Sequence, residues 1–87
     1  MNTFTLTIAT PDGNRFAGEA AGLYLRAAEG DLAILAGHTP FITSVQAGVC
    51  RIELPDESER TARVDGGLLT VAENKVTLLS GTIRWEE

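Results

Sequence analysis

Turn-forming residues recur along the whole chain and leave little more than strand-length intervals between them. Nine glycines and three prolines punctuate the 87 residues. Within residues 2–8 (NTFTLTI), the apolar side chains of Phe4, Leu6 and Ile8 alternate with threonines, which is the period of a strand with one buried face. Many short strands with regular turn signals are typical of a sandwich or a barrel. The sequence therefore predicts an all-β fold.

The same patterns predict further strands, of which residues 22–27 (GLYLRA) are the ambiguous one. The surrounding EAAGLYLRAAE could also form an alanine-rich helix. Gly22 costs a helix about 1 kcal/mol relative to alanine, and apolar and polar residues alternate after it, so we predict a strand. Residues 55–60 (PDESER) are predicted to form a charged hairpin tip. The predicted strands, which end in a meander, cover residues 2–8, 15–19, 22–27, 31–35, 41–46, 49–54, 60–64, 68–72 and 75–80.

Length and composition indicate one domain spanning residues 1–87. A chain of this length buries about 60–65% of the surface of its unfolded form, which allows one modest core. No stretch approaches the roughly 20 apolar residues of a membrane helix, and no secretory signal is visible at the N-terminus. Cys50 is the only cysteine, so it cannot form an internal disulfide. Its alternation with Ile52 and Leu54 predicts a small core residue rather than a reactive thiol.

The net charge is −5, from 12 acidic and 7 basic residues. The basic residues are scattered singly, whereas nucleic-acid binding needs a clustered basic face. Anionic lipid surfaces are disfavoured for the same reason. We therefore expect no nucleic-acid partner and no direct membrane insertion, while a basic protein partner stays open.

The only histidine, His38, is the natural candidate for catalysis or metal binding. A structural zinc site needs about four ligands, which one histidine and one cysteine do not supply. A site formed by His38, Glu29 and Asp31 with open coordination positions is conceivable, but nothing else in the sequence singles it out. Hydroxyl and thiol groups are present, but no nucleophile elbow or phosphate-binding loop accompanies them. We predict no catalytic residue, no metal, no nucleotide site and no cofactor.

A protein-binding role for the same segment is the alternative to chemistry. Pro40 restricts Thr39 to extended geometry and stiffens the loop around His38. Stiff surfaces that present aromatic side chains suit protein recognition. Packing of Phe41 and Ile42 into the core is an equally good interpretation at this point.

Lys75, the only lysine, raises a different class of function. Lipoyl and biotinyl carrier domains are small β-sandwiches that display a modified lysine at a hairpin tip. The flanking Asn-Lys-Val matches neither carrier motif. This carrier function is the runner-up hypothesis, together with other small interaction modules.

Taken together, these segments resemble a known family. EGDLAILAGHTPFITSVQAGVCRI (residues 29–52) resembles the epsilon subunit of F-type ATP synthases, whose hallmark is approximately E-G-E-L-G-I-L-P-G-H-A-P-L-x-T-x-L-x-P-G-x-x-R-I. VDGGLLTVAENKVTLLSG (residues 64–81) is similar to the family's G-G-x-x-E-V-x-x-N-x-V-T-x-L-A. FTLTIATPDG and the residues around Phe16 resemble its opening hairpin. The resemblance covers nearly the whole chain.

The resemblance implies a two-sheet β-sandwich of about ten strands without catalytic chemistry. Such a subunit lies at the foot of the central stalk, on the cytoplasmic face of a bacterial inner membrane. There it clamps the gamma subunit to the ring of c subunits and helps couple ion transport to ATP synthesis. By position, the resemblance assigns c-ring contact to Glu29, Gly30 and Asp31. It assigns gamma-subunit contact to His38, Pro40, Phe41 and Thr43.

Several positions depart from the family's pattern. The hallmark's second Glu, the Gly two residues later and the Pro before Gly-His are replaced by Asp31, Ala33 and Ala36, and a later Glu is replaced by Thr70. These departures suggest a divergent branch and leave the coupling ion, proton or sodium, undecided. Typical members continue into a two-helix domain that regulates ATP hydrolysis. This chain stops at TIRWEE, so we expect no C-terminal helical domain within it.

Overall fold

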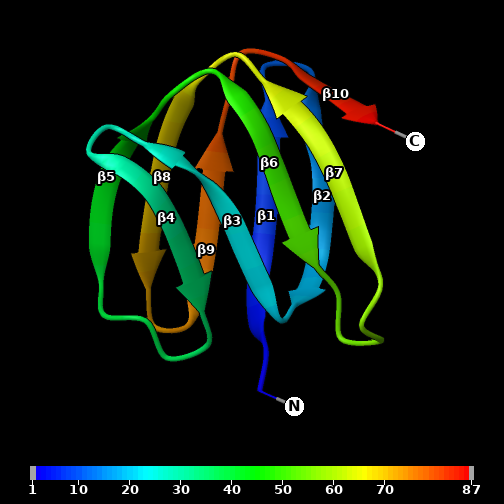
Figure 1. Cartoon of the computed structure of the whole chain (residues 1–87), viewed down its shortest axis with the longest axis vertical. Helices are drawn as coiled ribbons and strands as arrows, with labels where there is room; N and C mark the ends of the chain where they lie inside the picture. The colour runs from blue at the N-terminus through cyan, green and yellow to red at the C-terminus, as the bar shows by residue number, and fades with distance from the viewer. Residues whose placement is uncertain (1, 87) are drawn as a thin grey trace.

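The computed structural model describes residues 2–86, and ten β-strands are the regular elements in this range (Figure 1). The all-β prediction is confirmed. Nothing in the described range is a helix long and apolar enough to cross a lipid bilayer. The strands are β1 (Phe4–Thr10), β2 (Gly13–Ala20), β3 (Gly22–Ala27), β4 (Gly30–Leu35), β5 (Phe41–Val45), β6 (Gly48–Glu53), β7 (Glu59–Val64), β8 (Gly67–Ala72), β9 (Lys75–Leu79) and β10 (Ile83–Glu86).

The strands form a sandwich of two layers, as predicted (Figure 1). One layer has the strand order β5-β8-β9-β1-β2. The other has the order β10-β7-β6-β3, with β4 paired to β3. A single cross-strand pair, Ala27 of β3 with Val45 of β5, joins the two layers at one corner. Neighbouring strands are antiparallel except β1 and β9, which run parallel.

The predicted meander is wrong in the second half of the chain. β7 pairs with β6 and β10, whereas β8 pairs with β5 and β9. The consecutive strands β7 and β8 therefore lie in different layers. A meander would leave the apolar face of its sheet open to water. Because the chain crosses between layers after β2, β4, β5, β7 and β9, two apolar faces cover each other. The strand pattern also missed β10, although its four residues, Ile-Arg-Trp-Glu, alternate between apolar and charged side chains.

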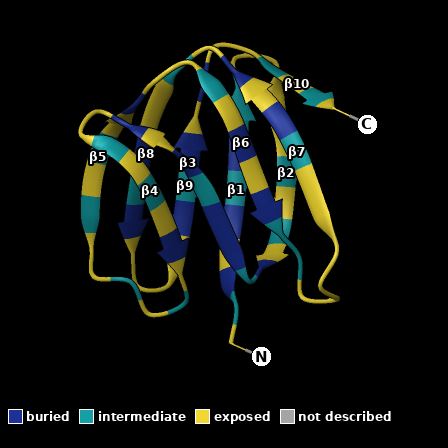
Figure 2. Ribbon diagram, viewed as in Figure 1, coloured by how far each residue is buried: buried dark blue, intermediate teal, exposed yellow. Residues whose placement is uncertain are grey.

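The inward positions of the alternating strands make the core (Figure 2). Phe4, Leu6 and Ile8 are buried, as the alternation in β1 predicts. Cys50 of β6 is fully buried in the same cluster, which confirms its prediction as a core residue. Burial raises the pKa of the Cys50 thiol to about 11, so the thiol stays protonated at neutral pH and is a poor nucleophile.

Aromatic side chains close the sandwich where its two end strands, β2 and β10, face each other. The ring of Phe16 in β2 lies 6.4 Å from the ring of Trp85 in β10, centroid to centroid. The guanidinium of Arg60 in β7 lies 3.8 Å from the centroid of the Trp85 ring. A guanidinium over an indole is worth about 0.5–2 kcal/mol, depending on its desolvation. These contacts cover the core between β2 and β10, which do not pair with each other.

Candidate functional site

The predicted c-ring group lies at the turn between β3 and β4. Glu29 is exposed at this turn, and Gly30 opens β4 with a φ of +123°, a conformation that favours glycine. Asp31 lies on β4 rather than on the turn, directly opposite Arg26 of β3. The Arg26 guanidinium and the Asp31 carboxylate are 3.3 Å apart, and both side chains are largely exposed. Such a pair is worth about 0–1 kcal/mol, so Asp31 remains free to exchange Arg26 for another cation.

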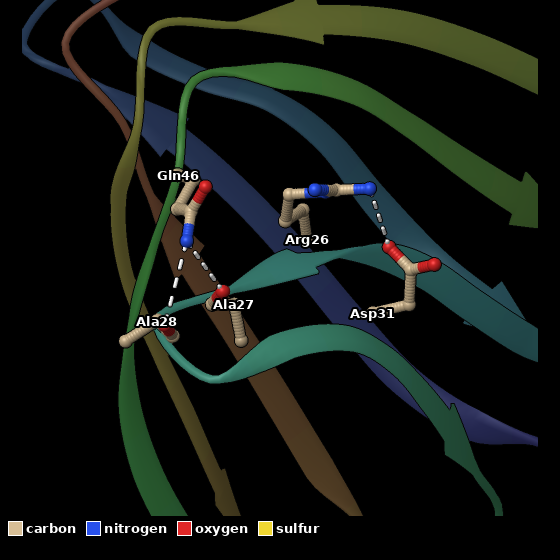
Figure 3. A network of polar contacts seen from close by, with 5 residues as sticks. All are labelled: Arg26, Ala27, Ala28, Asp31 and Gln46. Carbon is tan, nitrogen blue, oxygen red and sulfur yellow. Dashed lines mark hydrogen bonds and ion pairs between the residues drawn. The ribbon is translucent and has the colours of Figure 1, made fainter.

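Gln46 holds this turn in place from the neighbouring strand connection (Figure 3). Its Nε2 donates hydrogen bonds to the carbonyls of Ala27 at 3.1 Å and Ala28 at 3.4 Å. Its backbone N–H donates to the carbonyl of Arg26 at 2.9 Å. The acidic tip is therefore fixed to the β5–β6 connection and has a defined orientation.

His38 lies in the loop between β4 and β5, at the opposite end of β4 from the acidic turn (Figure 1). Its backbone N–H donates to the carbonyl of Leu35 at 3.2 Å. Its Nδ1 lies 2.7 Å from the carbonyl oxygen of Thr39, and its ring lies 5.3 Å from the ring of Phe41. These local contacts order the loop that Pro40 was predicted to stiffen.

Asn74 anchors the His38 loop to the rest of the sandwich. Its Oδ1 accepts a hydrogen bond from the backbone N–H of Gly37 at 2.9 Å. Its Nδ2 donates to the carbonyl of Thr3 at 2.8 Å, and its own carbonyl accepts from the N–H of Thr5 at 3.1 Å. Asn74 also occupies the left-handed region, with a φ of 62°. One residue of the β8–β9 turn thus ties together the chain's first strand and the loop that carries His38.

Replacing Asn74 with Gly should keep the turn and loosen the loop. Gly tolerates the positive φ, but both side-chain hydrogen bonds are lost, so we expect the free energy of unfolding to fall by about 1–3 kcal/mol. The backbone amide of Gly37 should exchange with solvent at least about tenfold faster, measured by NMR hydrogen exchange. Asn74→Asp is the matched variant, because it keeps an acceptor for Gly37 and loses the donor to Thr3. Unchanged exchange at Gly37 in Asn74→Gly would show that Asn74 does not hold the loop.

The two predicted groups meet along one shallow groove of about 450 Å³ between β4 and β5. The acidic group lines one wall and part of the gamma-contact group lines the other, with Glu29, Gly30, Asp31, Phe41 and Thr43 among its residues. His38 and Pro40 are not among the residues that line it. The structure therefore brings Phe41 and Thr43 next to the acidic residues and leaves His38 and Pro40 in the loop beyond.

The outer side of the β5-β8-β9-β1 layer is a separate surface that the sequence interpretation did not single out. The buried residues of these strands point into the sandwich, so the alternate residues point out. Lys75 is the one charged residue among these outer positions of β5, β8, β9 and β1. The uncharged ones, in register across the four strands, are Ile42, Ser44, Leu68, Thr70, Ala72, Thr77 and Leu79, continued by Thr5, Thr7 and Ala9 of β1. We call these residues the uncharged face. Ile42 is the most exposed of its large apolar side chains, at 71%, and Leu68 and Leu79 are exposed at 41% and 46%.

The other layer has a different outer side. Arg26, Arg51 and Arg63 form ion pairs there with Asp31, Glu59 and Glu86. Interface centres are depleted of charged residues, and exposed apolar patches on small domains mark interaction sites. The uncharged face is therefore the surface best suited to a protein partner.

The alternation in β5 contained the signal for Ile42. Val45 is buried, so Phe41 and Thr43 share its inward side and are half-buried, whereas Ile42 and Ser44 point outward. The gamma-contact prediction included the two inward residues and omitted the exposed one.

Within residues 2–86, no group of three or more His, Cys, Asp or Glu side chains could hold a metal ion. The hairpin tip of β8 and β9 is formed by Glu73 and Asn74, both at positive φ, and Lys75 is already the first residue of β9. Lys75 is exposed, but it does not occupy the tip position that a carrier lysine takes.

Comparison with protein families gives a match over almost the whole chain. Residues 3–86 match the family described as ATP synthase, Delta/Epsilon chain, beta-sandwich domain. A protein named ATP synthase epsilon chain, from Delftia acidovorans (strain DSM 14801 / SPH-1), is 42% identical over 82 residues. The matched part is 94% of this chain and 59% of that relative, so the chain spans little more than half of the relative's length.

Two solved structures share the fold. One is from the mitochondrial ATP synthase of Euglena gracilis, with a TM-score of 0.91 and 20% identity, over 95% of this chain and 53% of that chain. The other is from the central stalk and c ring of the mitochondrial ATP synthase of Tetrahymena thermophila. It has a TM-score of 0.75 and 16% identity, over 91% of this chain and 63% of that chain. At these identities the likeness concerns the β-sandwich itself.

Proposed function

The chain belongs to the β-sandwich domain family of ATP synthase delta and epsilon chains, and we propose that it works as a central-stalk rotor subunit of an F-type ATP synthase. In this role it clamps the gamma subunit to the c ring and supports the rotary coupling of proton or sodium transport to ATP synthesis. It has no catalytic residue and no cofactor, and it acts by rigid contact with its neighbours. Its place is the cytoplasmic face of a bacterial inner membrane, as part of a peripheral complex.

The uncharged face is the observation that supports a gamma-subunit contact. This chain has a net charge of −5, yet the outer positions of β5, β8, β9 and β1 hold Lys75 as their one charged residue within the described range. The three large apolar side chains exposed on this face favour contact with another protein, because each Å² of apolar area that is buried contributes about 25 cal/mol. We propose that Ile42 and its neighbours, with His38, Pro40, Phe41 and Thr43 at the margin, face the gamma subunit.

The acidic turn supports a separate contact with basic loops of the c ring. Glu29 has no ion-pair partner among the described residues, and the pair between Asp31 and Arg26 is exposed and exchangeable. Charge complementarity of this kind fixes the register of a complex more than it adds affinity. The rigid support from Gln46 suits a contact that must transmit torque.

Co-purification tests this function. The chain with an affinity tag, expressed in the cells that naturally produce it, should bring down gamma and c subunits in mild detergent. The intact mass of the same preparation tests the carrier alternative, because a species heavier by a cofactor at Lys75 would support it. A preparation with an unmodified mass and without either subunit would contradict both functions.

A further inference from the structure

We propose that Arg63 and Arg84 form a docking site for an acidic protein segment, on the opposite layer from the uncharged face. The two arginines are directly opposite each other in the antiparallel pairing of β7 with β10. Like charges in this position destabilise a sheet, by roughly 0.2–1 kcal/mol for a typical cross-strand pair. In a chain with only 7 basic residues against 12 acidic ones, this juxtaposition indicates a negatively charged partner.

The guanidinium groups have unused donors. Arg63 forms one ion pair, from its Nε to Glu86 Oε2 at 3.2 Å, and more than half of its side chain is exposed. Within residues 2–86, Arg84 forms no ion pair. A guanidinium has five N–H donors arranged to bind a carboxylate through two parallel hydrogen bonds. The two arginines can therefore donate hydrogen bonds to further carboxylates while Arg63 keeps its ion pair with Glu86.

A groove of about 580 Å³ gives such a segment room to approach. Beside the two arginines its lining contains Ala47, Gly48, Thr82 and Ile83, which are small or apolar. Asp65 is the only acidic residue of this lining, and its Oδ1 already accepts hydrogen bonds from the Ser80 hydroxyl at 2.9 Å and the Thr82 N–H at 3.1 Å. Asp65 is thus bound to its own loop and does not neutralise Arg84.

The surroundings favour a peptide carboxylate over a phosphate. Asp65 lies beside the arginines and repels the two charges that a phosphate brings to one point more strongly than the single charge of each carboxylate in an extended peptide. β10 pairs only with β7 on the described part of the chain, so its other edge leaves backbone groups free for an extended segment.

The test is an NMR titration with the peptide Ac-AEAEAE-NH2, whose carboxylates share one face when it is extended. We expect shifts of the backbone amides of Gly48, Thr82 and Arg84, and of the Nε–H of Arg63. The neutral peptide Ac-AQAQAQ-NH2 is the matched control and should cause none. Arg84→Ala should raise the dissociation constant at least about fivefold, because it removes one of the two guanidinium partners.

Arg15→Ala removes the same charge from an exposed position on β2 and should change the dissociation constant by less than about twofold. An equal loss in both variants, or equal binding of the two peptides, would overturn the docking site. Displacement of the acidic peptide by an equal concentration of inorganic phosphate would overturn it as well, and would assign the groove to phosphate. Co-purification of gamma and c subunits is independent of all these outcomes, so the two proposals can fail separately.

Discussion

Gly67→Ala should destabilise this protein more than any other single methyl addition at its glycines. Gly67 begins β8 with a φ of +150°, and an added Cβ would overlap the backbone carbonyl of Leu79 in β9 and lie 3.1 Å from the Cα of Ser80. Both obstacles are backbone, so no side-chain rotation relieves them. We expect the free energy of unfolding to fall by at least about 3 kcal/mol, a large part of the total of about 5–15 kcal/mol for a small domain. Urea denaturation followed by circular dichroism measures this loss.

Gly13→Ala is the matched control for the backbone conformation. Gly13 has a φ of +123°, but an added Cβ there meets no atom within 4 Å. It should therefore cost only the strain of a positive φ, about 1–3 kcal/mol, and Gly67→Ala should cost at least about 2 kcal/mol more because of its backbone overlap. A loss for Gly67→Ala within about 1 kcal/mol of the loss for Gly13→Ala would mean that β8 and β9 separate easily. In that case the close approach of the two strands would not be essential to the fold.

Ile42→Asp should abolish most of the affinity for the gamma subunit while leaving the fold intact. Ile42 is 71% exposed, so its removal creates no cavity, and the new charge lies on β5, the edge strand of the uncharged face, beside Thr70 of β8. Burying an unpaired carboxylate in an interface is costly, and we expect binding to weaken by about 2 kcal/mol or more, which is about thirtyfold. His38→Ala and Phe41→Ala should each weaken binding by more than about 1 kcal/mol if these residues are anchors at its margin. Titration calorimetry with purified gamma subunit measures all three.

Val49→Asp controls for the strand propensity of aspartate. Val49 is a β-branched residue that is 45% exposed, on β6 in the opposite layer. Aspartate disfavours strands by up to about 1 kcal/mol at either position, so the two variants share that cost. Gamma binding as weak in Val49→Asp as in Ile42→Asp would rule out the uncharged face as the contact surface.

Local patterns were sufficient to predict most strands because each has one buried face. In β1 the alternation of Phe4, Leu6 and Ile8 with threonines fixes both the strand and its inward side. The layer to which each strand belongs could not be read in this way. The parallel pairing of β1 with β9 joins residues about 70 positions apart in the chain, and no local signal encodes such a pairing.

The candidate site shows the same division between local and distant information. The stiff loop around His38 could be predicted from Pro40, but its attachment to Asn74, 37 residues away from Gly37, could not. The pairing of Asp31 with Arg26 could be predicted from the sequence, since the two residues flank a short turn between neighbouring strands. The contrast between the uncharged face and the charged outer side of the opposite layer needs the strand order, which only the tertiary structure provides.

The most direct test of the proposed rotor function uses purified chain and purified gamma subunit from the same source. We predict a 1:1 complex that remains together during gel filtration at physiological salt. Adding the c ring should give a larger complex that dissociates more readily as salt is raised, because the acidic turn contributes charge complementarity. Separate elution of the chain and gamma, with both shown to be folded by circular dichroism, would contradict a central-stalk role.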